Sequence, residues 1–302
     1  AFLCCPWPWN LEEVGFGEWG PVASATTRTA TYVLGEPHVT REWWDDVPDE
    51  VAMKVWALPL FEASPASWEA DPQTLPILCQ GDFDGDCEED VVWAQPDILT
   101  VLWSGSERAD YAWPVGEIGL FARGNRDADD KPELAVIVYA GSTSVVWASL
   151  AGRTLAVSAP VLDLAVLPQA VVAGDLNLDG LDDIVVAGLV LSAAGDAEAP
   201  EIAVDGIQLD VCLSTGVTSR LRPEKFPAGD ALWSYGALAL GDLTRDGIND
   251  LAMSSVSGAG VLVLPGEGDG SFDAGFAIPV PVGPLWICDL DGNGQAELVS
   301  AV

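Results

Sequence analysis

Five acidic segments with one shared pattern recur along this chain of 302 residues. In each segment, oxygen-bearing side chains occupy positions 1, 3, 5 and 9, and an apolar run begins at position 10. The segments are named here by their first residues as the Asp82, Asn125, Asp175, Asp242 and Asp289 loops. A unit repeated in this way is typical of solenoids and propellers, in which neighbouring units bury a shared core.

The residues around these loops have the composition of short β-strands. Apolar runs of 4 to 8 residues, rich in Val and interrupted by Gly, Pro and Asp, favour strands over helices. The expected strands include Asp90–Ala94, Ile98–Trp103, Ile184–Ala187 and Val261–Leu264, and no segment has a convincing amphipathic helical pattern. Clustered glycines at 264–272 predict a tight hairpin that needs positive φ angles. Four short strands in about 45 residues predict an all-β propeller built from four-stranded blades.

The spacing of the loops predicts the number of blades. The loops start at residues 82, 125, 175, 242 and 289, so the intervals are 43, 50, 67 and 47 residues. The longest interval contains a small, polar insertion at 193–200, which we expect to be an exposed hairpin or loop. The spacing favours six blades, with seven as the alternative, in a single domain over residues 1–302.

The N-terminal residues are expected to close this ring. The last loop begins only 13 residues before residue 302, so its blade needs strands from elsewhere in the chain. Residues 20–80 would supply them, with Thr26–Leu34 as a candidate strand, together with one blade that has no clear metal loop. Residues 42–51 resemble a decayed loop, because Asp46 and Glu50 fall at positions 5 and 9 while Trp44 occupies position 3.

The polar positions of the loops suit a hard cation. Side chains at positions 1, 3 and 5 of a tight loop can point inward together, while a backbone carbonyl at position 7 and a side chain at position 9 complete an oxygen cage. Such a cage without His or Cys favours Ca²⁺ over Mg²⁺ and over softer metals, so we expect about five Ca²⁺ ions. The expected ligands are Asp82, Asp84, Asp86, Glu88, Asp90, Asn125, Asp127, Asp129, Lys131, Glu133, Asp175, Asn177, Asp179, Leu181, Asp183, Asp242, Thr244, Asp246, Ile248, Asp250, Asp289, Asp291, Asn293, Gln295 and Glu297.

The five loops are not expected to bind equally well. The Asp82 loop has four carboxylates and a glycine for the sharp turn, so it should be the strongest site. The Asp242 loop has the neutral Thr244 at position 3, and the Asn125 loop has no glycine at position 4 or 6. Solvated acidic turns without metal are the alternative. An EF-hand is excluded, because position 12 holds Trp93, Val136, Val186, Met253 and Ser300 instead of Glu.

These loops, together with the Gly-Asp-Gly-Ser-Phe hairpin at 268–272, resemble the FG-GAP/VCBS repeats of integrin α-subunit-like β-propellers. The resemblance covers residues from about 80 to 302. It implies calcium loops between the first two strands of most blades and an extracellular or cell-surface location. The family usually closes seven blades, whereas the spacing here favours six.

Composition excludes several classes of function. The chain has 12 Lys and Arg against 47 Asp and Glu, and its net charge of −35 argues against a basic surface for nucleic acid or anionic membrane. The sequence contains no run of 18 apolar residues, so no transmembrane helix is expected. The single histidine, His38, leaves little scope for histidine-dependent catalysis, and the six cysteines form no paired zinc pattern.

The function expected from these features is non-catalytic. We predict a calcium-stabilised, extracellular binding or adhesion module that recognises carbohydrate or protein ligands. Trp7, Trp9, Trp43 and Trp44 are candidates for exposed, lectin-like contacts, while tryptophans in strand-like contexts are expected in the core. A structural subunit of a surface layer or fibre, formed by self-assembly, is the first alternative. A propeller-based hydrolase or lyase is the second, although no GxSxG nucleophile motif is present.

Overall fold

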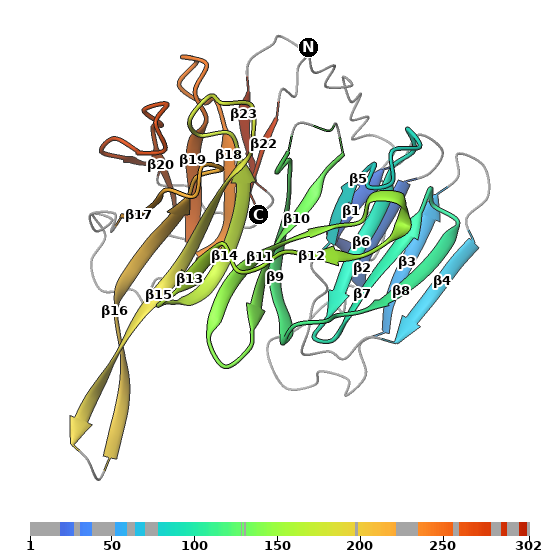
Figure 1. Cartoon of the computed structure of the whole chain (residues 1–302), viewed down its shortest axis with the longest axis horizontal. Coiled ribbons are helices and arrows are strands. Elements are labelled where there is room, and N and C mark those ends of the chain that lie inside the picture. The colour runs from blue at the N-terminus through green and yellow to red at the C-terminus, as the bar shows by residue number, and fades with distance from the viewer. Residues whose placement is uncertain are drawn as a thin grey trace. The chain divides into compact units, whose positions relative to one another are not determined.

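The computed structural model shows an all-β chain (Figure 1). It describes residues 19–26, 31–37, 52–58, 64–69, 78–127, 129, 131–196, 199–221, 235–255, 260–278, 285–288 and 296–300. Within these ranges the one helical element is a short 3-10 turn, η1 (Ala151–Arg153). Accordingly, the described residues include no helix with the length and hydropathy needed to cross a bilayer.

The chain divides into two compact units, and the first comprises Ala1–Pro114 with Ala151–Arg153. It contains two antiparallel sheets of four strands, each in the order of the sequence. The first sheet is formed by β1 (Trp19–Thr26), β2 (Thr31–Pro37), β3 (Ala52–Leu58) and β4 (Ser64–Glu69). The second sheet is formed by β5 (Leu78–Gly81), β6 (Asp90–Gln95), β7 (Ile98–Trp103) and β8 (Glu107–Ala112).

The second unit comprises Val115–Leu150 with Thr154–Val302 and contains four antiparallel sheets among the described residues. One has five strands: β9 (Glu117–Gly124), β10 (Glu133–Tyr139), β11 (Thr143–Ser149), β12 (Ala156–Val157) and β13 (Leu162–Leu164). Two sheets have four strands each. One is formed by β14 (Leu167–Gly174), β15 (Asp183–Asp196), β16 (Ala199–Cys212) and β17 (Thr218–Leu221). The other is formed by β18 (Tyr235–Gly241), β19 (Asp250–Ser255), β20 (Val261–Leu264) and β21 (Phe276–Ile278). The last has two: β22 (Leu285–Cys288) and β23 (Glu297–Ser300).

Most of the strands expected from sequence are present. The strands expected at Ile98–Trp103 and Val261–Leu264 are β7 and β20, and the hairpin expected at 264–272 has positive φ angles at Gly268 and Gly270. The exception is Thr26–Leu34, because β1 ends at Thr26 and β2 begins at Thr31. This Thr-rich segment therefore spans a connection between two strands.

The N-terminal strands pair with one another. β1 to β4 form a four-stranded antiparallel sheet, and β23 pairs with β22. The closure of a ring by the N-terminal residues stays a prediction. The decayed loop proposed at 42–51 lies outside the described residues, as do Trp7, Trp9, Trp43 and Trp44.

The insertion expected at 193–200 extends an existing hairpin. β15 and β16 each have 14 residues and pair from Ile184 with Cys212 out to Asp196 with Ala199. This two-stranded ribbon projects beyond the rest of its sheet (Figure 1).

The sheets of the second unit pack face to face, with alternate residues of one strand in two different cores. Ile184 and Val186 of β15 lie in a cluster with Trp147 of β11, whereas Val185 lies in a cluster with Met253 of β19. Burial on both faces explains why the strand sequences are nearly continuous apolar runs. The tryptophans expected in the core are buried, since Trp93, Trp103 and Trp147 are exposed by 8%, 1% and 6%.

A glycine directly before three of the loops lets each sheet approach the next. A Cβ on Gly124 would lie 2.7 Å from the Cβ of Ala173, one on Gly174 would lie 3.0 Å from Leu240, and one on Gly241 would lie 2.4 Å from Ile287. Ala173 and Leu240 directly precede the next glycines of this series. The same contact therefore recurs from sheet to sheet within the second unit.

Candidate metal loops

Each described loop connects the first and second strands of a sheet, as predicted. Position 9 is the first residue of the second strand, which is Asp90 in β6, Glu133 in β10, Asp183 in β15 and Asp250 in β19. The sharp turn needs left-handed backbone at positions 4 and 6 in three of the loops. These pairs are Gly85 and Cys87 (φ 84° and 67°), Leu178 and Gly180 (62° and 86°), and Arg245 and Gly247 (67° and 86°). One glycine in each pair removes half of the steric cost.

The carboxylate at position 1 organises the turn. In the Asp82 loop, Oδ1 of Asp82 accepts hydrogen bonds from the backbone N–H groups of Gly85 and Asp86 at 2.7 and 3.0 Å, and Oδ2 accepts from Cys87 at 2.8 Å. Asp175 and Asp242 accept the equivalent bonds from positions 5 and 6 of their own loops. Position 1 therefore holds the loop in shape as well as offering oxygens to a cation.

The carboxylate at position 9 connects the loop to the far end of the third strand. Oδ2 of Asp183 accepts from the N–H of Leu176 at 2.8 Å, and Oδ1 accepts from the N–H of Ser214 at 2.6 Å. Asp90 and Asp250 make the same two kinds of bond. All three are fully buried, so these bonds compensate for the loss of water around the carboxylate.

In the Asp82 loop, burial and hydrogen bonding shift the pKa values of Asp90 and Asp86 in opposite directions. Burial raises the pKa of Asp90 to about 6, against the effect of the two N–H groups bonded to it. Burial also raises the pKa of Asp183 and of Glu133. At position 5, the pKa of Asp86 is lowered by the N–H of Glu88 and the hydroxyl of Ser104. The exposed Asp86 thus remains anionic, while the buried Asp90 gains from a nearby positive charge.

The structure brings the carboxylates of two loops together. In the Asp82 loop, oxygens of Asp82, Asp84 and Asp90 lie within 4.8 Å of one another. In the Asn125 loop, oxygens of Asp127, Asp129 and Glu133 do so. Lys131, expected to offer its carbonyl at position 7, donates its N–H to Asp129 at 3.0 Å.

The Asn125 loop also contains the polar atom that best fits a cation. Oδ1 of Asn125, at position 1, is buried and has no hydrogen-bond partner. A buried acceptor without a donor is unfavourable, and a hard cation accepts amide and carboxylate oxygens as ligands. The donor set of this loop therefore fits Ca²⁺, although the sequence made it one of the less secure sites.

The Asp175 and Asp242 loops have no such convergent trio of carboxylates among the described residues. The amide of Asn177 donates to Asp179 at 3.0 Å. Thr244 donates its N–H to Asp250 at 2.7 Å. The position 7 residues Leu181 and Ile248 donate their N–H groups to position 5. Of the Asp289 loop, Glu297 is the first residue of β23, while Asp289, Asp291, Asn293 and Gln295 lie outside the described residues.

Sequence reasoning missed the side chains that connect the loops to their surroundings. At position 8, Asp182 accepts from the N–H of Asn125 at 2.7 Å, and Asn249 donates to the carbonyl of Asp175 at 2.8 Å. Ser104 and Ser214 donate their hydroxyls to the position 5 carboxylates Asp86 and Asp179 at 2.9 and 2.6 Å. Position 8 is Glu, Pro, Asp, Asn and Ala in the five loops, so no residue pattern marks it.

Comparison with known proteins identifies no family. No protein-family model and no curated protein matches the chain. Among solved structures, BBS1N in complex with ARL6DN is 13% identical over 95% of this chain and 94% of that chain, with a TM-score of 0.47. The V. cholerae biofilm matrix protein Bap1 is 13% identical over 91% of this chain and 73% of that chain, with a TM-score of 0.39.

Proposed function

We propose that the chain is a calcium-stabilised β-propeller of the FG-GAP/VCBS type that acts as a non-catalytic binding module. The propeller is supported by antiparallel sheets that follow one another in sequence order and, in the second unit, by the glycine contact that recurs from sheet to sheet. Six sheets in the described residues support six blades.

The observation that carries the calcium proposal is the unpartnered, buried Oδ1 of Asn125 in the same loop as three converging carboxylates. Asn125, Asp127, Asp129 and Glu133 would hold the ion. Bound Ca²⁺ would supply positive charge that offsets their mutual repulsion and the burial of Glu133. The N–H groups bonded to Asp127, Asp129 and Glu133 already fix the direction of these carboxylates.

Calorimetric titration of metal-free protein with Ca²⁺ tests this proposal. We expect binding to wild type, with Mg²⁺ binding more weakly because these loops do not impose octahedral geometry. Asp129→Ala should bind one ion fewer, since it removes a converging carboxylate. Asp163→Ala, which removes an exposed acid on β13, should bind the same number as wild type. No uptake of Ca²⁺ by wild type would reduce the loops to solvated acidic turns.

We further propose that the module works outside the cell or on its surface and recognises carbohydrate or protein ligands. Trp286 of β22 is 48% exposed and offers an indole face of the kind that stacks on sugars. A glycan array should give calcium-dependent signals that Trp286→Ala weakens. A blank array would favour a protein ligand or the alternative role, a self-assembling subunit of a surface layer or fibre.

A further inference from the structure

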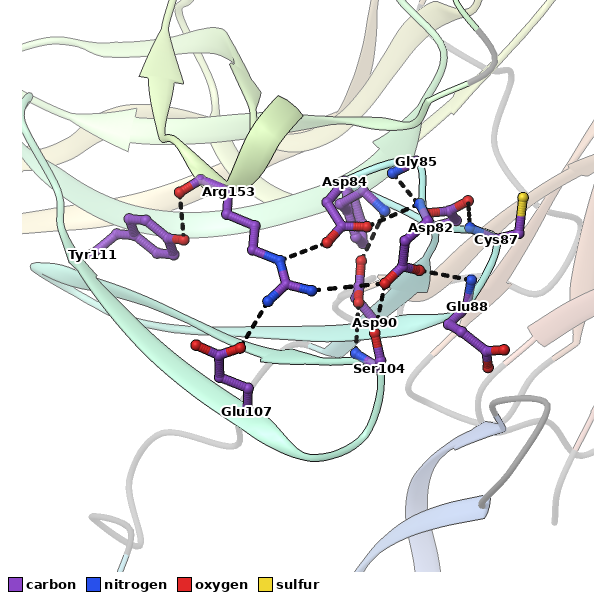
Figure 2. A network of polar contacts seen from close by, with 12 residues as sticks. Asp82, Asp84, Gly85, Cys87, Glu88, Asp90, Ser104, Glu107, Tyr111 and Arg153 are labelled. Atoms are coloured by element: carbon purple, nitrogen blue, oxygen red, sulfur yellow. Dashed lines mark hydrogen bonds and ion pairs between the residues drawn. The ribbon is translucent and has the colours of Figure 1, made fainter.

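Arg153 contacts three acidic side chains at the Asp82 loop (Figure 2). Its Nε donates to Oδ2 of Asp84 at 2.7 Å, and its NH1 donates to Oε2 of Glu107 at 2.7 Å. Its NH2 lies 3.6 Å from Oδ2 of Asp86. The side chain of Asp84 is only 6% exposed, so this pair is better shielded from water than an ordinary surface ion pair.

The backbone and the arginine side chain are both fixed at this point. Gly152 and Arg153 have φ angles of 61° and 59°, a conformation that is unfavourable for arginine unless the surroundings impose it. The carbonyl of Arg153 accepts a hydrogen bond from the hydroxyl of Tyr111 at 2.9 Å. Its guanidinium lies 5.2 Å from the ring centre of Trp103, within the range of a cation–π interaction. The η1 turn therefore delivers this guanidinium to one defined place.

That place coincides with two of the expected metal-ligand positions. Asp84 and Asp86 are positions 3 and 5 of the loop, and each directs one oxygen at the guanidinium. A guanidinium satisfies carboxylates through fixed, planar hydrogen bonds, so its departure leaves them anionic and open.

We infer that Arg153 is a built-in counter-cation of the Asp82 loop, and that a divalent cation can occupy Asp84 and Asp86 only when Arg153 leaves. This inference rests on the proposed binding of calcium by the loops. It implies that the Asp82 loop, which the sequence predicts to be the strongest calcium site, is weakened by Arg153. The loop with the most carboxylates is the one whose charge is already partly compensated within the chain. Calcium and Arg153 are then competitors for the same oxygens.

Titration of Ca²⁺ into metal-free Arg153→Ala and wild type tests the competition. If Arg153 contacts Asp84 and Asp86 in about nine molecules of ten, the apparent affinity of this loop for Ca²⁺ is about tenfold weaker than its intrinsic affinity. Arg153→Ala should therefore show one site that is tighter by about that factor. Adding Asp84→Asn to Arg153→Ala should abolish the gain, which assigns it to this loop. Arg153→Lys keeps the positive charge but loses the forked, planar donors, so its site should be tighter than in wild type and weaker than in Arg153→Ala. If Arg153→Ala fails to fold, Glu107→Gln can be used instead. It removes the charge of one partner of Arg153 outside the loop, and it should tighten the site for Ca²⁺ by about threefold.

The outcomes distinguish this inference from the proposed function. If wild type binds several ions and neither Arg153→Ala nor Glu107→Gln changes the number or affinity of the sites, the inference is wrong and the proposed function stands. If wild type binds none and Arg153→Ala gains one, the inference stands and the general calcium proposal fails. If neither protein binds Ca²⁺, both are wrong.

Discussion

Replacing Asp183 with alanine should lower the free energy of unfolding of the metal-free protein by about 1–3 kcal/mol, because the buried N–H of Leu176 is left without an acceptor. The N–H of Ser214 bonds to the other oxygen of this fully buried carboxylate, but Ser214 is exposed, so water can replace that acceptor. Urea denaturation in excess chelator measures the change without any contribution from bound metal.

Two further variants separate this effect from a general loss of charge. Asp183→Asn keeps the size of the side chain and one acceptor oxygen, so its destabilisation should fall between wild type and Asp183→Ala. Asp179→Ala removes the exposed carboxylate at position 5 of the same loop and should cost less than about 1 kcal/mol in chelator, as is usual for surface pairs. Equal losses for Asp183→Ala and Asp179→Ala would mean that position 9 has no special structural role.

The second large effect is expected at Gly124, the residue directly before the Asn125 loop. A Cβ at this position would lie 2.7 Å from the Cβ of Ala173 and 2.9 Å from the ring of Trp147, which is itself buried. A methylene added to a tightly packed site typically costs about 1–3 kcal/mol, so Gly124→Ala should destabilise by that amount in thermal or urea unfolding.

Ala173→Gly provides the matched control. It removes the atom nearest to the new Cβ, so the double variant should be more stable than the sum of the two single changes predicts, with a coupling of at least about 0.5 kcal/mol. The contact with Trp147 remains, which limits the rescue. Strict additivity, or no cost for Gly124→Ala, would show that the sheets do not meet closely at this residue.

The sequence was sufficient for the repeating unit. Alternating acidic and apolar residues placed the loops between first and second strands, and Ile98–Trp103 and Val261–Leu264 were predicted as strands because apolar runs of this length fit a sheet that is buried on both faces. The sequence-based prediction failed at Thr26–Leu34, where Thr, Tyr and Val have high strand propensity and no Gly, Pro or Asn marks the connection between the two strands.

The roles of the site residues were less accessible from sequence. The pattern marks an acid at position 9, but it does not reveal that the oxygens of Asp90 or Asp183 bond backbone N–H groups of the third-strand turn. Arg153 lies 69 residues after Asp84, in a turn without any motif, so no local signal points to their ion pair. Residue type and spacing predict which groups a loop offers, whereas competition for these groups depends on the tertiary structure.

The recurring glycine contact makes the second unit a series in which each sheet is stabilised by its immediate neighbours. The sheets of β14–β17 and β18–β21 each contribute to two buried clusters, whereas Leu285 of β22 contributes to one. In such a nearest-neighbour array, opening one of these two sheets breaks both of its interfaces within the unit. We therefore expect the backbone amides of β15 and β19 to be among the slowest in the second unit to exchange with solvent.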